Sequence, residues 1–368
     1  MGHCWCKQNY MLINRCILTK LSIIRFFHGR IAIELHLILQ ILMLNCLKSR
    51  RELDYMAYKK VFDANKATRE EWLEFRKSGI GGSDMAAILG LSKYRSALDV
   101  WMDKTGRTIP SNDDGNRFTY WGTKLESIVA DEFAIRTGYS VRNNNFTLQS
   151  VEYPFLLANI DREIVGIDAG LECKTASAFK VDEWQGDSVP DAYYIQCQHY
   201  MAVTGKKSWW IAALVGGNDY YYKEIPRNDN VIEAIIEAAQ EFWSFVLTDT
   251  MPAVDGSDSC QEALRQLYSS TQPESVQLED TADIYAEAYL KAKADKKDAE
   301  ERAKEAQNNL CQLLANNEVG YTQNHKITWK YKKAIDGFDK KGLAADYPDI
   351  FSKYVIKNDP VRNQFSCK

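Results

Sequence analysis

Asp161, Glu172 and Lys174 stand among apolar residues between positions 155 and 176, in the stretch FLLANIDREIVGIDAGLECKTA. Glu172 and Lys174 are two residues apart, so in a β-strand both side chains point to one face, and Cys173 points to the other. Asp161 ends the preceding apolar run, and a chain that doubles back through the glycine-containing turn brings Asp161 near Glu172. Two carboxylates suit Mg²⁺ or Mn²⁺, and a neighbouring lysine activates water or stabilises a charged transition state. This is the chemistry of phosphodiester hydrolysis.

The same pattern has a simpler explanation when it is taken alone. A Glu and a Lys two apart on a solvated hairpin form a surface ion pair that does no chemistry. Asp168 is a second candidate carboxylate, but it lies in the turn itself and is the poorer one. The motif therefore gains weight only from residues elsewhere in the chain.

Two predicted helices flank the strands and carry further polar residues. The helix predicted over 121–138 carries Glu126. One face of the helix predicted over 188–205 carries a glutamine between two tyrosines, at spacings i, i+3 and i+7: Tyr193, Gln196 and Tyr200. A glutamine and two tyrosines are unusual on a helix face that packs into a core. We therefore interpret this face as part of a functional site.

The body alternates helices and strands, which predicts an α/β fold with a mixed central sheet flanked by helices. Thr68 caps a predicted helix over 65–79, and Ser83 or Asp84 caps a short helix after Gly81-Gly82. The other expected elements are a helix over 96–106, a loop over 110–116, strands between 139 and 176, a hairpin over 207–226 and a helix over 230–247.

Composition and charge set limits on the partners of the protein. Apolar residues make up 45% of the chain, charged residues 26%, and the net charge is −4, which is ordinary for a globular protein. Any surface for nucleic acid must therefore be a local patch. Nine cysteines without a CxxC pair form neither a disulfide framework nor a zinc set, which favours a reducing, cytoplasmic setting.

The first 55 residues differ from the rest. They hold eight Lys and Arg against three Asp and Glu, and residues 31–47 alone suggest a membrane helix, although four polar residues interrupt them. We interpret residues 1–55 as a poorly ordered or non-native extension, translated from a start upstream of Met56. An amphipathic membrane helix is the alternative.

Five segments are expected along the chain. They are the extension over 1–55, a core over 56–250, a linker over 251–277, a long charged helix over 278–316 and a small α+β segment over 317–368.

Four motifs of the core, taken together, resemble a known family. They are FRKSGIGGSDMAAILG, WGTKLESIVADEF, ANIDREIVGIDAGLECKTA and YYIQCQHYMAVTG. Their order resembles the PD-(D/E)xK nuclease core with its restriction-endonuclease-like fold, and specifically the YqaJ-type viral recombinases related to bacteriophage lambda exonuclease. One departure is Ile160, which stands before Asp161 where the motif's name has a proline.

The resemblance implies a metal site. Asp161 and Glu172 would hold two Mg²⁺ or Mn²⁺ ions, with the backbone carbonyl of Cys173 as a further ligand. Glu126 would serve the metals from its helix, although an ordinary surface position is its simpler explanation.

The resemblance also implies roles around the metals. Lys174 would position or activate the attacking water, and Gln196 would orient the water or the lysine. Arg76 and Ser83 would bind the 5′-terminal phosphate of DNA, which agrees with the affinity of guanidinium, hydroxyl and helix N-terminus for phosphate. A solvated charge and a plain helix cap are the alternatives for these two. Three further residues are interpreted as lying beside the DNA: Tyr193, Gln198 and His199. For Gln198 and His199, a structural role is the alternative.

The function implied is a 5′→3′ exonuclease on duplex DNA ends, in the cytoplasm of a bacterial host. It would leave 3′ single strands for an annealing protein in phage recombination, and the family suggests a ring-shaped trimer without membrane contact. The rival hypotheses are an endonuclease of phage or defence type and an inactive DNA-binding recombination module. The intact set of Asp161, Glu172 and Lys174 argues against the second rival.

Overall fold

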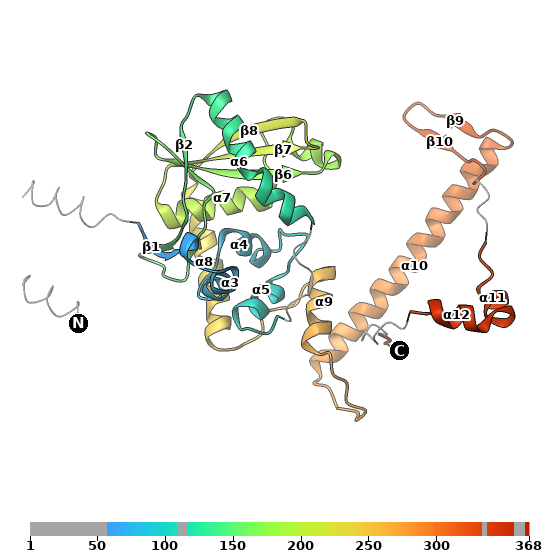
Figure 1. Ribbon diagram of the computed structural model, residues 1–368. Coiled ribbons are helices and arrows are strands. Elements are labelled where there is room, and N and C mark those ends of the chain that lie inside the picture. Colours follow the sequence, from blue (N-terminus) through green and yellow to red (C-terminus); the bar gives the residue numbers. More distant parts are fainter. Residues whose placement is uncertain (1–56, 109–116, 333–336, 357–364, 368) are drawn as a thin grey trace, which may run out of the picture. The chain divides into compact units, whose positions relative to one another are not determined.

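The computed structural model describes residues 57–108, 117–332, 337–356 and 365–367 (Figure 1). The chain divides into two compact units, residues 1–261 and 262–368, and each is considered by itself. The extension expected over 1–55, its membrane-helix alternative and the loop expected over 110–116 lie outside the described residues. No helix of the described part is both long and apolar enough to cross a membrane.

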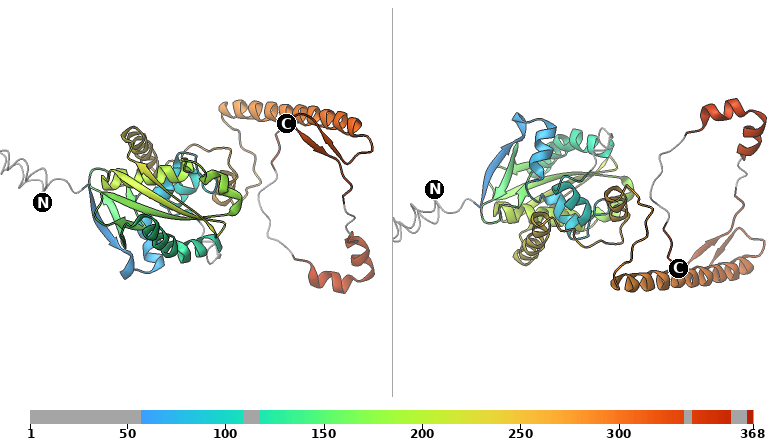
Figure 2. Two further views of the ribbon diagram at one scale, coloured as in Figure 1. Left: turned by 90° about the horizontal axis from the view of Figure 1, so that it is seen from above. Right: turned by 90° about the horizontal axis from the view of Figure 1, so that it is seen from below.

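A five-stranded mixed sheet forms the centre of the first unit (Figures 1 and 2). Its strands, in spatial order, are β2 (Val141–Asn143), β5 (Arg162–Ile164), β6 (Ala169–Ala176), β7 (Ser208–Val215) and β8 (Asp219–Pro226). Strands β6 and β7 are parallel, and the other neighbours are antiparallel. This confirms the predicted α/β fold with a mixed central sheet, and the predicted hairpin is β7–β8.

A smaller antiparallel sheet joins β1 (Tyr58–Asp63), β3 (Phe146–Ser150) and β4 (Leu157–Ala158). The sequence did not predict β1. Its partner β3 lies more than eighty residues further along the chain, so no local hairpin signal marks it. The 3₁₀ turn η1 (Ala64–Lys66) then leads into the first helix.

Helices cover both faces of the central sheet. Helix α6 (Arg117–Thr137) packs on one face, where Phe133 meets Leu171 and Ala212 in an apolar cluster. Helix α7 (Asp191–Thr204) packs on β7 and on the smaller sheet. Helices α4 (Gly82–Ile88) and α8 (Asp229–Leu247) pack against α7, and α5 (Ala97–Lys104) packs against α4 and α8.

Local sequence explains where most helices begin and end. Thr68 caps α3 (Arg69–Arg76) as predicted, and it exchanges reciprocal hydrogen bonds with Glu71. Helix α7 ends at Gly205, whose φ of 72° is the left-handed conformation that glycine adopts readily. Helix α6 begins at Arg117, four residues before the predicted start.

The predicted cap of α4 is wrong. The helix starts after Gly81, which takes the N-cap position, and neither Ser83 nor Asp84 stands there. Asp84 is instead the third helical residue, and its carboxylate accepts a hydrogen bond from the N–H of Gly81 at 3.1 Å. The cap is therefore made by a side chain inside the first turn rather than before it.

The second unit contains a long helix and few buried residues. Helix α10 (Thr281–Leu314) lies within the helix predicted over 278–316, and the hairpin of β9 (Val319–Tyr321) and β10 (Lys326–Thr328) follows. Two short helices, α11 (Lys340–Asp346) and α12 (Pro348–Tyr354), complete the α+β segment expected over 317–368. Pro348 interrupts the hydrogen-bond pattern between them. Helix α9 (Asp258–Leu267) precedes these elements, and the division between the two units falls within it.

Candidate active site

Glu172, Lys174 and Gln196 form one hydrogen-bonded cluster between β6 and α7. The Nζ of Lys174 lies 2.6 Å from Oε1 of Glu172 and donates to Oε1 of Gln196 at 3.0 Å. The Nε2 of Gln196 donates to the same Glu172 oxygen at 2.8 Å. The strand spacing thus places the carboxylate and the ammonium on one face, as predicted, and the helix supplies the amide that contacts both.

The two tyrosines on the same face of α7 complete the cluster. The Nε2 of Gln196 also donates to the hydroxyl oxygen of buried Tyr200 at 2.7 Å. The Lys174 ammonium lies 4.8 Å from the ring centroid of Tyr193, within the range of a cation–π contact. The spacing of Tyr193, Gln196 and Tyr200 therefore reflects one polar network that fixes the glutamine amide.

Asp161 lies across from Glu172 at the end of the β5–β6 pair. Arg162 pairs with Leu171 in this antiparallel ladder, so the preceding Asp161 faces Glu172. Its Oδ2 accepts a hydrogen bond from the N–H of Cys173 at 2.8 Å. Burial raises the pKa of Asp161 well above its usual value, and the nearby charges of Glu172 and then Glu126 raise it further.

The alternative carboxylate Asp168 lies elsewhere. Its side chain is about half exposed in the turn before β6, and its Oδ1 is 3.7 Å from Nζ of Lys206. Because Asp161 reaches the β6 backbone beside Glu172 and Asp168 does not, the geometry favours Asp161 as the second carboxylate of the site.

Glu126 reaches the site from α6 but is held by an arginine. It forms an ion pair with Nη1 of buried Arg162, and the same nitrogen donates to the backbone oxygen of Asp161 at 2.7 Å. Sequence reasoning missed Arg162. The available signal was a charged residue directly after Asp161 that shares one strand face with apolar Ile164, the face that is buried.

The carboxylates of Asp161 and Glu172 could hold a divalent cation between them. Glu172 has a buried Oε2 without a hydrogen-bond partner in the described part of the molecule, and Asp161 carries a destabilised negative charge beside it. A cation between the two would satisfy both. The described residues contain no group of three His, Cys, Asp or Glu side chains arranged to hold a metal.

A cavity of about 610 Å³ opens beside the cluster. It is lined by the two residues expected to bind phosphate, Arg76 and Ser83, and by Lys174, Tyr193 and Gln196. Five cationic side chains and two acidic ones line it in total: Arg76, Lys93, Arg95, Lys174 and Lys180 against Glu183 and Asp191. Such a lining favours an anionic ligand.

A second cavity of about 370 Å³ lies on the α6 side of the cluster. Glu126 and Cys173 line it, and it shares Lys174 and Tyr193 with the larger cavity. Glu126 and Cys173 thus lie toward the smaller cavity and Arg76 and Ser83 toward the larger, and Lys174 lines both.

For Gln198 and His199, the structure favours the structural alternative over a place beside DNA. Both side chains are fully buried. Gln198 donates to the backbone oxygen of Pro226 at 2.9 Å and accepts from the N–H of Asn228. His199 Nε2 lies 2.9 Å from the backbone oxygen of Leu157, and burial lowers the pKa of its imidazole. Both residues therefore tie α7 to its neighbours.

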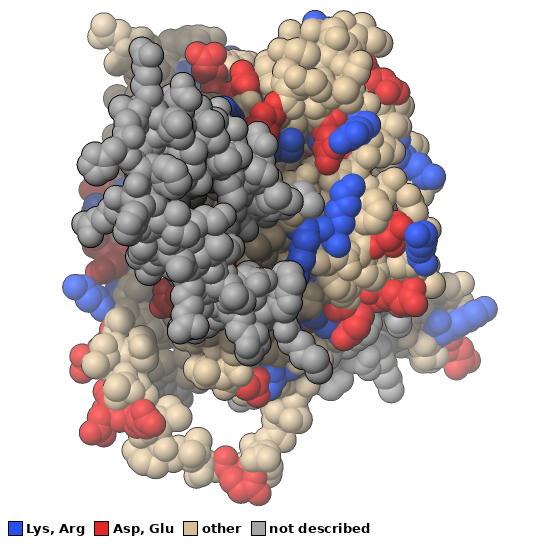
Figure 3. All heavy atoms as spheres, turned by 90° about the vertical axis from the view of Figure 1, so that its left-hand side faces the viewer, with Lys and Arg blue, Asp and Glu red and all other residues tan. Residues whose placement is uncertain are grey.

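The outer surface shows no comparable concentration of positive charge on the face drawn in Figure 3. Among the described residues visible there, Lys and Arg side chains alternate with Asp and Glu. This mixture of charges agrees with the small net charge of −4.

Known proteins resemble this chain over most of its length. Residues 71–207 match the family described as the YqaJ-like viral recombinase domain. The protein described as "Uncharacterized protein YqaJ" of Bacillus subtilis (strain 168) is 38% identical over 305 residues, which are 82% of this chain and 94% of that protein.

Two solved structures are more distant. An alkaline exonuclease (LHK-Exo) from Laribacter hongkongensis is 18% identical, with a TM-score of 0.41 over 49% of this chain and 93% of that one. A phage related exonuclease from Haemophilus somnus 129PT is 16% identical, with a TM-score of 0.35 over 46% and 96%. Likeness at this level assigns no activity. The sequence matches do assign a family, and the chain belongs to the YqaJ-like viral recombinases.

Proposed function

We propose that the protein is a metal-dependent deoxyribonuclease that degrades duplex DNA from its ends in the 5′→3′ direction. One observation carries the proposal. A single cationic cavity is lined both by Arg76 and Ser83, which suit a phosphate, and by Lys174 and Gln196, which suit hydrolysis. A terminal phosphate and a scissile phosphodiester of one strand can therefore lie in one connected space.

Asp161 and Glu172 would hold Mg²⁺ or Mn²⁺, together with the backbone carbonyl of Cys173. A bound cation would polarise the scissile phosphodiester and stabilise the negative charge that develops on it. Glu126 would contribute only after it leaves Arg162, because the ion pair occupies its carboxylate.

Lys174 supplies a fixed positive charge beside the carboxylates. Burial alone would lower the pKa of Lys174, but the charges of Glu172 and Asp161 outweigh it and raise the pKa. The ammonium therefore donates hydrogen bonds to the attacking water or the phosphate oxygens. Gln196 holds the ammonium at 3.0 Å and so sets its direction.

Cleavage of linear and closed DNA tests the reaction. Purified protein with Mg²⁺ should degrade linear duplex to completion and leave a covalently closed circle intact, because an end must enter the cavity. EDTA should stop the reaction. Cutting of the closed circle would support the endonuclease alternative instead.

Matched carboxylate variants test the site. Asp161→Asn should reduce cleavage by about a hundredfold or more, the usual scale for loss of a group that stabilises transition-state charge. Asp168→Asn, seven residues away in the exposed turn, should retain it. Lys174→Ala should also abolish cleavage while DNA ends still bind. Equal activity of the two Asn variants would refute the assignment of Asp161.

The 5′ end tests polarity. A duplex with a 5′-phosphate should be degraded faster than the same duplex with a 5′-hydroxyl, and Arg76→Gln should remove the difference. Two further expectations of the family are proposed with it, a homotrimer and a single-strand annealing partner. Light scattering of the purified protein tests the first, and co-purification from the producing cell tests the second.

A further inference from the structure

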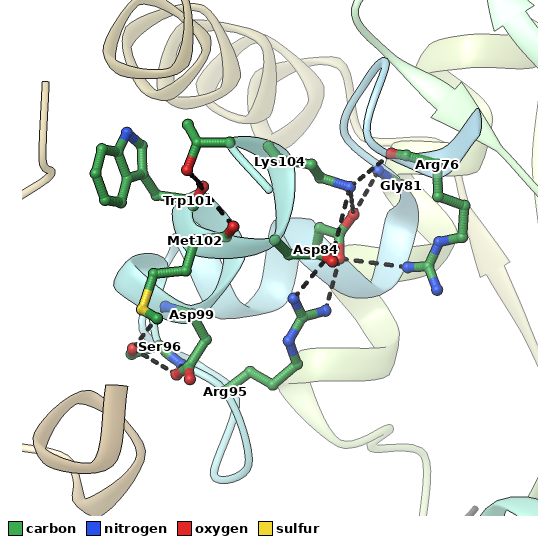
Figure 4. Close-up of polar contacts among 11 residues, drawn as sticks. Arg76, Gly81, Asp84, Arg95, Ser96, Asp99, Trp101, Met102 and Lys104 are labelled. Carbon is green, nitrogen blue, oxygen red and sulfur yellow. Dashed lines mark hydrogen bonds and ion pairs between the residues drawn. The ribbon is translucent and has the colours of Figure 1, made fainter. Parts of the chain in front are cut away.

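One buried carboxylate beside the cavity holds three cations that come from different parts of the chain (Figure 4). Asp84 in α4 is fully buried. Its Oδ2 accepts from Nζ of Lys104 at 2.7 Å, and its Oδ1 lies 2.9 Å from Nη1 of Arg95 and 3.4 Å from Nη2 of Arg76. The three cations therefore converge on a single side chain.

Exposure separates the three cations into two kinds. The side chain of Lys104 is completely buried, whereas 23% of the Arg76 side chain and 35% of the Arg95 side chain are exposed. Both arginines line the 610 Å³ cavity. Lys104 thus acts as the interior counter-charge of Asp84, and the arginines present charge to the cavity.

Backbone bonds connect the same cluster to the elements around it. The Nζ of Lys104 also donates to the backbone oxygen of Arg76 at 2.9 Å, at the end of α3. The N–H of Gly81 donates to Asp84. The positions of α3, α4 and α5 are therefore linked through one carboxylate.

Stability alone is a poor reason for this arrangement. Burial alone would raise the pKa of Asp84, but Lys104, Arg76 and Arg95 outweigh it and lower the pKa. Buried ion pairs gain little net stability, because removing both charges from water costs about as much as their attraction returns. A second and third cation on the same carboxylate add like-charge repulsion between themselves.

We infer that Asp84 is the positioning residue of the phosphate-binding cavity, aligning the guanidinium groups of Arg76 and Arg95 on one anionic group of the DNA end. Each guanidinium has five N–H donors, and Asp84 takes one of them from each arginine. Arg95 is also 3.6 Å from Asp103. The other donors of the pair can converge on one phosphate. The inference rests on the proposed function, which places a 5′-phosphate in this cavity.

Two variants that differ only at Asp84 test the alignment. Lys104→Met removes the buried ammonium, so Asp84→Asn can be added without leaving an unpaired buried cation. Lys104→Met is therefore compared with Asp84→Asn/Lys104→Met. The readout is the ratio of dissociation constants for a 5′-hydroxyl and a 5′-phosphate duplex with one free end, measured in EDTA.

The ratio should be about tenfold or more in the wild type and in Lys104→Met, as expected for charge-assisted hydrogen bonds. It should fall to about threefold or less in the double variant. A double variant that keeps the ratio of Lys104→Met would overturn the inference. Asp99→Asn is the matched control, since Asp99 caps α5 through Ser96 in the way that Asp84 caps α4 but contacts neither arginine (Figure 4). It should leave the ratio unchanged.

A second variant keeps the test decisive if the double variant does not fold. Arg95→Gln changes a partly exposed side chain, and it should lower the ratio at least about threefold. An unchanged ratio would overturn the paired role of Arg95. A wild type without any preference for 5′-phosphate would refute both the cavity assignment and this inference. A wild type that prefers 5′-phosphate but cleaves nothing with Mg²⁺ would refute only the proposed hydrolysis. The comparison of the two Asp84 variants would then still test the positioning role of Asp84.

Discussion

At the scale of single residues, the site is a balance of three carboxylates against two cations. Glu172 is neutralised by Lys174, and Glu126 by Arg162. Asp161 has only the N–H of Cys173 as its hydrogen-bond donor among the bonds found for its side chain in the described residues. The remaining negative charge therefore lies on Asp161, and this residue should be the most sensitive to a bound cation.

Asp161→Asn should make the metal-free protein more stable while it abolishes cleavage. The pKa of Asp161 is raised in the folded chain, so the folded protein binds a proton more readily than the unfolded chain, and the ionised carboxylate costs stability as the pH rises. Removing the charge should raise the melting temperature in EDTA, by about 2–4 °C for each kcal/mol gained.

The control is the response to metal. Mg²⁺ should raise the melting temperature of the wild type, because binding to the folded state stabilises it, and should leave Asp161→Asn unchanged. A variant that melts below the wild type in EDTA would contradict the charge balance.

Tyr200→Phe should impair cleavage through the amide that it holds. Loss of the hydroxyl removes one bond to Gln196, costs about 1 kcal/mol of stability and frees the amide that orients Lys174. Cleavage should fall several-fold with DNA binding unchanged. Tyr220→Phe is the matched control, because its hydroxyl donates to the backbone oxygen of Val129 on the α6 side. The two variants should lose similar stability, and equal loss of cleavage would contradict the role of Tyr200.

At the scale of elements, the site depends on how closely α4 approaches α7. A Cβ built on Gly82 would lie 2.8 Å from the Tyr200 ring and 3.0 Å from Cγ of Gln196. Only a glycine allows the first turn of α4 to contact these side chains directly. The residue next to Ser83 thereby limits how closely the proposed phosphate ligands approach the cluster of Gln196 and Lys174.

Gly82→Ala should therefore be costly and Gly81→Ala mild. The added methyl of Gly82→Ala must push Tyr200 and Gln196 aside, at about 1–3 kcal/mol for overpacking, and cleavage should fall with stability. At Gly81 the nearest atom is Oδ2 of Asp84 at 3.5 Å, an ordinary contact. Thermal melts and cleavage rates of the two variants check this. Similar effects of both would show that the close approach is unimportant.

Sequence predicts the elements of this site better than the contacts between them. Period-two and helical spacing placed Glu172, Lys174 and Gln196 on facing surfaces, because those spacings are fixed by backbone geometry. The Arg162–Glu126 pair and the contacts of Asp84 with Arg95 and Lys104 were missed. Each joins residues far apart in the chain that meet only after the tertiary fold has formed, and no local spacing encodes such a meeting.

At the scale of the whole molecule, the two units differ in how they are stabilised. The first has an extensive apolar core. In the second, Leu314 is the one buried residue among those described from Thr281 onward. Helix α10 depends instead on its length and on exposed pairs four residues apart, such as Arg302–Asp298 at 2.9 Å. Each such pair contributes only about 0.3–0.5 kcal/mol.

A chain that ends at residue 268 should keep the cooperative unfolding of the first unit. The intact chain should lose part of its helical circular dichroism signal gradually, below the main transition, because α10 lacks a core that would make its unfolding cooperative. The shortened chain should lack this gradual part and keep the sharp transition. A shift of the sharp transition by more than about 5 °C would show that the second unit stabilises the first.

The larger cavity has a consequence for inhibition. Its volume of about 610 Å³ is within the range of sites that hold small molecules, roughly 300–1,000 Å³. Arg76 and Arg95 stand in its lining with the ring of Tyr193 and the apolar surface of Val189 and Pro190. A flat aromatic ring bearing one phosphonate matches both the charge and the apolar wall. Such a compound should compete with DNA ends, and it should lose potency in Asp84→Asn/Lys104→Met, which makes it a chemical probe for this family.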